Sequence, residues 1–137
     1  MKTHKSLYNI TIAAIKRHAM HPETWLYSKI ISTPEAEGFD LDSEELPVFL
    51  IESEVAKTLV TTRRIIETSI GNSKQTLITE IQSTDYGLFK GDINKPDLSD
   101  FKIITINNNS ITFQFETGKA SIGLIYAINT LRKLHKH

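Results

Sequence analysis

The loop from Asp85 to Gly91 holds the residues with the clearest potential for recognition. It reads Asp-Tyr-Gly-Leu-Phe-Lys-Gly, and therefore places an acid, two aromatic rings and a lysine among glycines. Binding residues concentrate in loops that a rigid scaffold holds in place. The sequence predicts these contact residues in the loop: Asp85, Tyr86, Phe89 and Lys90. The alternative is a plain hairpin turn in which Phe89 packs into the core, because apolar loop residues usually pack.

Arg64 is the fifth predicted binding residue. It follows Arg63 in a strand pattern, and neighbouring residues of a strand point to opposite faces of the sheet. A guanidinium group pairs well with carboxylates and phosphates. We expect structural roles for these arginines, with an anion contact as the alternative.

Three histidine- or glycine-containing patterns favour ordinary structure over chemistry. His18, His21 and Glu23 have spacing that could suit a metal, but Pro22 interrupts the helix that would align them. His135 and His137 are expected to lie at a disordered terminus. The segment Thr117–Ser121 contains Gly-Lys but lacks the earlier glycine of a phosphate loop, so it predicts a helix start.

We predict no catalytic residue, no metal and no cofactor. A serine, a histidine and an acid can meet in space from anywhere in a chain. Here, however, the histidines lie near the two ends of the sequence, outside the strand patterns, and no nucleophile elbow is present. The chain is therefore expected not to be an enzyme, with an enzyme of unrecognised type as a remaining alternative.

Composition limits the class of protein. The 137 residues include 16 basic and 16 acidic residues, so the net charge is zero, and general nucleic-acid binding, which needs a basic excess, is not expected. Hydrophobic residues make up 39%, enough for one compact core. The absence of cysteine excludes disulfides and thiolate chemistry. With no signal-peptide or membrane-helix pattern, we expect a cytoplasmic protein.

The N-terminal third of the sequence predicts two helices and a linker. Apolar residues recur at helical spacing over Leu7–Met20, with Ser6 as the cap. Glu23–Ile31 reads as a second helix that packs Trp25 into the core, with a strand as the alternative. Ser32–Ser43 reads as an exposed acidic linker. With Glu44 and Glu45 it carries six acids, which would favour a basic partner.

The rest of the sequence predicts a sheet and a closing helix. Period-two patterns rich in β-branched residues mark the strands, the turn residues between them mark hairpins, and Asp85–Asp100 reads as a long loop. The expected strands are Val48–Ser53, Lys57–Thr62, Gln75–Ile81, Phe101–Ile106 and Ile111–Glu116. Arg63–Ile70 either continues the second of these or forms a strand of its own. A helix capped by Thr117 follows over Ala120–Lys133, and its apolar residues form one broad stripe.

These residues resemble a known family. Glu44-Glu45, a strand, and then Leu59-Val60-Thr61-Thr62-Arg63-Arg64-Ile65-Ile66 are similar to a pattern of bacterial pleckstrin-homology-like (PH-like) domains. The resemblance covers about residues 44 to 135. It implies an α+β fold in which a strongly bent antiparallel sheet, or partly open barrel, is closed by the C-terminal helix. Residues 1–43 would form a helical extension and linker, and residues 44–137 the PH-like part of one compact domain.

The resemblance also implies a binding role, because members bind lipids, peptides or proteins. Phosphoinositide-binding members carry clustered basic residues around the first hairpin, whereas that loop here reads Ser53-Glu54-Val55-Ala56-Lys57. We therefore expect a protein or peptide partner, bound through a sheet edge or the Asp85–Gly91 loop. The alternative is a lipid- or small-anion-binding module that uses Lys90, Lys119 or Arg64.

Overall fold

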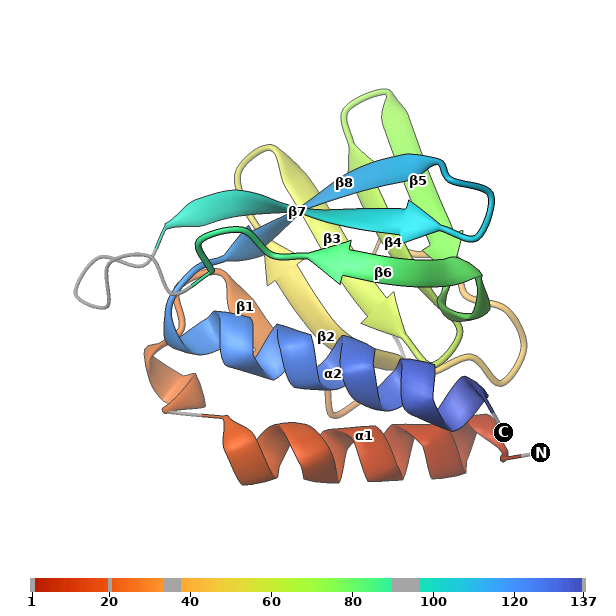
Figure 1. The fold of residues 1–137 in the computed structure, drawn as a ribbon. Helices are drawn as coiled ribbons and strands as arrows, with labels where there is room; N and C mark the ends of the chain where they lie inside the picture. Colours follow the sequence, from red (N-terminus) through yellow and green to blue (C-terminus); the bar gives the residue numbers. More distant parts are fainter. Residues whose placement is uncertain (1, 20, 34–37, 90–96, 137) are drawn as a thin grey trace.

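The computed structural model describes residues 2–19, 21–33, 38–89 and 97–136. Within these ranges the chain is α+β: two α-helices accompany two antiparallel sheets (Figure 1). The elements in chain order are α1 (His4–His18), the 3₁₀ turn η1 (Pro22–Thr24), β1 (Ser28–Ile30), β2 (Pro47–Glu52), β3 (Ala56–Thr61), β4 (Arg64–Ser69), β5 (Asn72–Leu77), the 3₁₀ turn η2 (Ile78–Glu80), β6 (Ile81–Asp85), β7 (Leu98–Thr105), β8 (Ser110–Glu116) and α2 (Lys119–His135).

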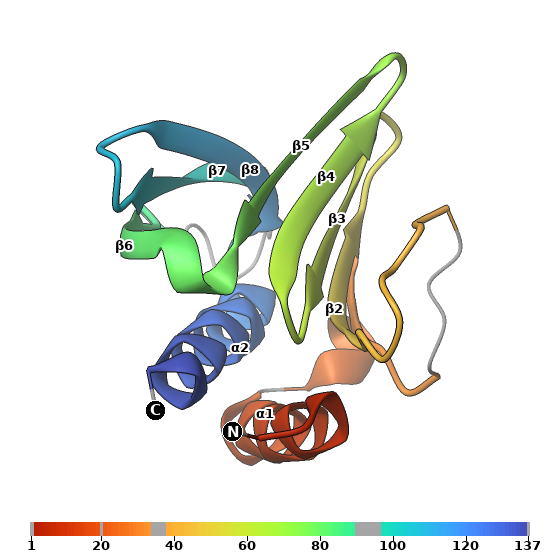
Figure 2. The ribbon, with the colours of Figure 1, turned by 90° about the vertical axis from the view of Figure 1, so that its right-hand side faces the viewer.

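The first sheet is a five-stranded meander in the order β1-β2-β3-β4-β5. Short hairpin turns join β2 to β3, β3 to β4 and β4 to β5. Residues 63–70 thus belong to a separate strand, the second of the two alternatives that the sequence left open. The last turn needs only Ile70 and Gly71, and Gly71 has a φ of +70°, which glycine adopts without strain. The β4–β5 hairpin extends beyond the rest of the molecule (Figure 2).

The second sheet contains β6, β7 and β8 in that order. The strands form two sheets where the sequence predicted one strongly bent sheet or partly open barrel: η2 turns the chain between β5 and β6, and the backbone ladder stops there. The described strands do not close into a barrel. The expected long loop Asp85–Asp100 is also shorter than predicted, because β6 ends at Asp85 and β7 begins at Leu98.

The two α-helices lie side by side and antiparallel along one end of the sheets (Figures 1 and 2). Helix α2 covers the end where the two sheets diverge, and α1 packs against α2 and against β2. This position explains the broad apolar stripe of α2: one side of the helix meets the sheets and the adjoining side meets α1. None of the described helices is long and apolar enough to cross a membrane.

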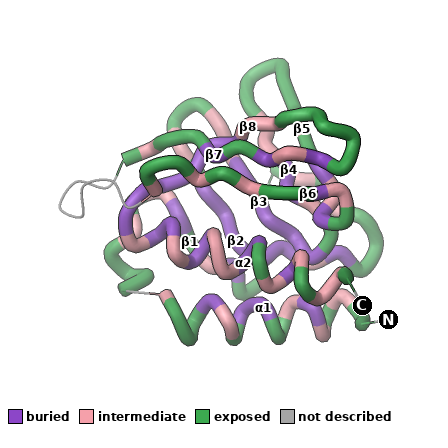
Figure 3. Tube along the Cα trace, viewed as in Figure 1, coloured by how far each residue is buried: buried purple, intermediate pink, exposed green. Residues whose placement is uncertain are grey.

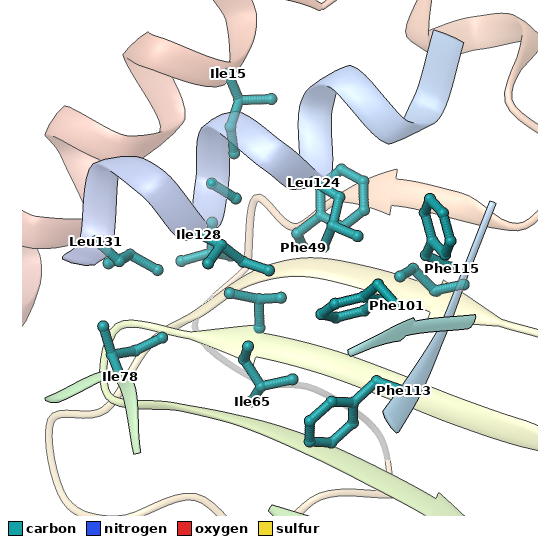
Figure 4. Packing of buried hydrophobic residues seen from close by; sticks show 14 of the residues in the cluster. Ile15, Phe49, Ile65, Ile78, Phe101, Phe113, Phe115, Leu124, Ile128 and Leu131 are labelled. Carbon is teal, nitrogen blue, oxygen red and sulfur yellow. The ribbon is translucent and has the colours of Figure 1, made fainter. Parts of the chain in front are cut away.

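One hydrophobic cluster joins α1, α2 and both sheets (Figure 4). Ile15 of α1, Phe49 of β2 and Leu124 of α2 meet within it, and each is at most 1% exposed. Phe101 and Phe113 line its β7–β8 side, with ring centroids 5.7 Å apart. Buried positions concentrate along β2, β3 and α2, whereas the turn of the β4–β5 hairpin is exposed (Figure 3). The division of the chain at residue 43 stays a prediction; α1 and β1 pack with the later elements.

Both predicted helix caps are wrong by a few residues. Helix α1 begins at His4, and the Thr3 hydroxyl, rather than Ser6, accepts a hydrogen bond from the Ser6 amide at 3.1 Å. Helix α2 is preceded by Gly118, whose φ of +80° favours glycine over threonine. The Thr117 hydroxyl bonds instead to the Asp97 backbone, accepting from its amide at 3.0 Å.

The second predicted helix is wrong, and its alternative, a strand, is present as β1. The carboxylate of Glu116 explains the difference, because it accepts hydrogen bonds from the amides of Leu26 and Tyr27 at 2.9 and 2.8 Å. These bonds hold the chain extended and lead it into β1. Trp25 packs as expected, with its ring 5.6 Å from that of Phe49. A Cβ on Gly123 of α2 would lie 2.8 Å from the indole, so only glycine fits beneath it.

Candidate functional site

The loop after β6 packs into the protein along much of its described length. The ring of Tyr86 stacks on Phe101 at 5.5 Å, and Phe89 is half-buried against the core. Asp85 accepts a hydrogen bond from the Gly87 amide at 2.9 Å, and the Phe89 carbonyl accepts one from Gly118 at 2.8 Å. The anchored-turn alternative describes these contacts well. Lys90 lies outside the described residues, so its predicted role stays untested.

Tyr86 is the titratable group most affected by this packing. Burial raises the pKa of its hydroxyl to about 12, while a contact with Thr84 and the positive charge of Arg132 act weakly in the opposite direction. The hydroxyl oxygen is buried and makes no hydrogen bond of normal geometry within the described part of the chain. A phenol held neutral in this way suits packing or weak donation better than proton transfer at neutral pH.

Arg64 lies far from this loop, on the outer face of the five-stranded sheet. Its Nε and Nη2 donate to the two carboxylate oxygens of Glu45 at 2.9 and 3.1 Å. Nη2 also donates to the Asp40 carbonyl, and Nη1 donates to Gln75 at 2.6 Å. Four of its five N–H groups are thus in use. The structure does not bring Arg64 together with the Asp85–Phe89 segment.

The described acids of the predicted linker, Asp40 and Asp42, are exposed as expected, and so is Glu44, whereas Glu45 is buried. Glu45 is 4% exposed; in addition to Arg64 it accepts hydrogen bonds from the Thr61 hydroxyl and from the Asp42 amide. Asp42 forms an ion pair with Arg63. The expectation of an exposed acidic surface is therefore wrong for Glu45, because buried arginine contacts neutralise it. The acids at 35 and 37 lie outside the described residues.

The histidines take structural positions. His18 stacks on Tyr126 of α2, with ring centroids 3.9 Å apart, and His21 lies 3.5 Å from Glu23. The expected disorder of His135 is wrong. His135 is the last residue of α2, and its Nε2 donates to the Thr62 carbonyl at 2.7 Å. His137 is outside the described residues. No group of three metal-binding side chains occurs within the described ranges.

A groove of about 420 Å³ runs beside β5. It lies between the segment Gly38–Asp40 and the outer faces of β4 and β5, where Phe39 and Ile66 provide apolar walls. Its lining residues are Gly38, Phe39, Asp40, Arg64, Ile66, Thr68, Ser73, Lys74 and Gln75. Among the predicted binding residues that the structure describes, Arg64 alone lines it. Its Nη1 makes one hydrogen bond, to Gln75, within the described part of the chain.

A larger cavity, of about 760 Å³, lies at the start of α1. Lys2, His4 and Lys5 line one part of it, and Glu44 lines it from the turn before β2. Sequence reasoning missed this site because its residues lie some forty positions apart and form no motif. The full lining consists of Lys2, Thr3, His4, Lys5, Tyr8, Asn9, Ser32, Thr33, Glu44 and Leu46.

Comparison with known proteins adds no relative. No family model, no curated protein and no solved structure matches the chain.

Proposed function

We propose that the protein is a non-enzymatic interaction module that binds an extended segment of a partner protein along β5. The observation that carries this proposal is an edge strand with a groove beside it. β5 ends the five-stranded sheet, so one of its sides has no neighbouring strand among the described residues. An added peptide strand would gain backbone hydrogen bonds there, and its alternate side chains would enter the groove.

The register shows which backbone groups of β5 are available. Ser69 and Asn72 flank a two-residue turn, and residues in that position exchange backbone hydrogen bonds. Alternation then directs the amides of Ser73, Gln75 and Leu77 away from β4. The Ser73 amide donates to Asn72 at 2.9 Å and the Leu77 amide to Glu80 at 3.3 Å. In the described structure, the Gln75 amide remains for a partner.

The groove suits a peptide with one apolar side chain. Phe39 is half-buried, and Ile66 lies on the floor with 6% exposure. An aliphatic side chain placed between them would leave water without displacing any charge. The N–H of Arg64 that has no acceptor among the described residues would donate to a carbonyl or carboxylate of the peptide.

We also propose that residues 44–137 form a PH-like domain with residues 1–43 as its extension. Support comes from the chain order, in which antiparallel strands precede a helix that covers one end. The bacterial and peptide-binding character that this resemblance implies, and the cytoplasmic location expected from the lack of a signal-peptide or membrane-helix pattern, belong to the same proposal.

A library of random peptides tests the function directly. Binders selected on the wild-type chain are measured against Gln75→Pro, which removes the outward amide, and against Gln75→Ala, which keeps it. Proline is tolerated in an edge strand when its nitrogen faces solvent. We expect the proline variant to lose binding at least tenfold and the alanine variant to change it far less. Equal binding by both variants, or no selectable peptide, contradicts the proposal.

A further inference from the structure

The cavity at the start of α1 contains charged residues that have no charged partner. Lys2, Lys5 and Glu44 are all exposed, and within the described ranges none of them forms an ion pair. The volume of about 760 Å³ lies in the range of small-molecule sites, usually 300 to 1,000 Å³. Unpaired charges on a cavity wall remain free to meet a ligand.

The walls of the cavity are held by hydrogen bonds that leave its charges free. The Tyr8 hydroxyl donates to the Ile31 carbonyl at 2.6 Å, which fixes its ring. His4 shares a hydrogen bond with the Thr62 hydroxyl through Nδ1 at 2.6 Å, and its Nε2 has no partner in the described structure. Thr3 already accepts a hydrogen bond from the Ser6 amide, and Lys2 and Lys5 carry the full positive charges of the cavity wall.

The turn that carries Glu44 is unusual. Glu44 has a φ of +71°, and the Glu45 amide donates to the Asp42 carbonyl across the turn at 3.1 Å. Glycine or asparagine normally occupies such a position. Glutamate there places an acid on the same cavity as the two lysines, where it reduces the attraction for an anion.

We propose that this cavity binds a small organic anion: an anionic group, phosphate or carboxylate, on an apolar body. Lys2 and Lys5 would hold the anionic group, and Tyr8 and Leu46 would contact the apolar body. Glu44 would weaken binding and so set the affinity. This site is separate from the β5 edge, and each can fail without the other.

An NMR titration at constant ionic strength tests the site with three probes: inorganic phosphate, phenyl phosphate and benzoate. We expect saturable amide shifts at the cavity residues, and tighter binding of phenyl phosphate than of inorganic phosphate. Phenyl phosphate binding more tightly than benzoate assigns a phosphate monoester, and the reverse order assigns a carboxylate. Shifts that do not saturate, or that spread over surface lysines, overturn the site. Equal affinity for inorganic phosphate and phenyl phosphate contradicts the part of the proposal in which the ligand has an apolar body.

Variants separate the cavity from general charge. Lys2→Gln with Lys5→Gln should weaken phenyl phosphate binding about fivefold or more, because each exposed ion pair contributes roughly two- to fivefold. Glu44→Gln should tighten it about twofold. The matched control is Lys16→Gln with Arg17→Gln, an equal loss of charge on exposed residues at the far end of α1. Equal weakening by the control, or weaker binding in Glu44→Gln, contradicts the proposal.

Discussion

Glu44 and Glu45 are adjacent in the chain but lie in opposite electrostatic surroundings. Glu45 is buried and forms a bidentate pair with Arg64. Glu44 is exposed on the cavity at the start of α1 and has no ion pair in the described structure. A charge that the protein satisfies internally stabilises the fold, whereas a charge left unpaired beside a cavity is available for binding. The comparison therefore separates an acid that the fold pairs internally from one that faces a cavity.

The largest expected effect is on stability, at the Glu45 end of this comparison. Glu45→Gln leaves the guanidinium of Arg64, only 13% exposed, without its counter-charge. We expect the free energy of unfolding to fall by about 3 kcal/mol. Urea denaturation measures it, with Glu44→Gln as the matched control, which should change it by less than about 0.5 kcal/mol. Similar losses in both variants would break the comparison.

A double-mutant cycle sharpens the same prediction. Glu45→Gln combined with Arg64→Met removes both charges together. The double variant should be more stable than the sum of the single losses predicts, by about 2 kcal/mol, because neither charge is then left alone. Additive losses would show that the pair is not coupled.

Tyr86 tests a buried hydroxyl that makes no hydrogen bond of normal geometry within the described residues. Its pKa is raised to about 12 by burial, so the folded state holds the proton more tightly than the unfolded state, where the value is near 10. The contribution of this tighter proton binding to the free energy of unfolding is complete below pH 10 and is lost as the pH rises from 10 to 12. Wild type should therefore lose about 1 to 2 kcal/mol more than Tyr86→Phe over this window.

Two measurements check the behaviour of Tyr86. Urea denaturation at several alkaline pH values compares the two proteins, and tyrosinate absorbance shows whether one of the four tyrosines titrates late. At pH 7, Tyr86→Phe should be as stable as wild type or slightly more stable, because a buried unpaired hydroxyl is removed. A clear loss at pH 7 would indicate a hydrogen bond to this hydroxyl.

Glu44→Gly should raise the free energy of unfolding, by less than Glu45→Gln lowers it. A non-glycine residue at a φ of +71° carries backbone strain that glycine relieves. Part of the gain is offset by the greater freedom of glycine in the unfolded chain, so we expect about 0.5 kcal/mol of stabilisation. Thermal and urea unfolding both measure it. Destabilisation would mean that the Glu44 side chain contributes to the fold.

The smallest effect is expected at the exposed pair of Asp42 and Arg63. Their side chains are 51% and 44% exposed, so water and salt screen the attraction. Asp42→Asn should lower the free energy of unfolding by less than about 0.5 kcal/mol, and the difference should vanish at high salt. A loss that persists in high salt would place this pair with Glu45 as a structural contact.

Local patterns predicted the hairpins and the closing helix. In β2, β3 and β4 the β-branched residues and turn residues agree with the fold, and the apolar stripe of α2 is strong enough to be read directly. β1 was not predicted as the first choice, because its extended shape depends on Glu116, nearly ninety residues away. The break at η2 also leaves no clear mark in the sequence.

The candidate sites were less predictable than the fold. Arg64 was a reasonable candidate, yet its partner Glu45 could be identified only once β4 and the preceding turn were placed in space. Lys2 and Glu44 meet at one cavity through packing of α1 beneath the sheet, which no spacing rule describes. A sequence identifies the charged residues, but only the fold identifies which of them pair with one another.

The carboxylate of Glu116 also has a consequence for biosynthesis. It holds Leu26, Tyr27 and Ser28, the last through its hydroxyl at 2.8 Å, so the first strand of the sheet is fixed by the last residue of β8. A nascent chain emerges from the ribosome with its N-terminus first, and contacts between residues distant in sequence form late. While residues up to β8 are still being made, the segment that becomes β1 must wait without this anchor. A nascent chain stalled before Glu116 emerges should therefore leave that segment open to protease, and one stalled well after it should protect it.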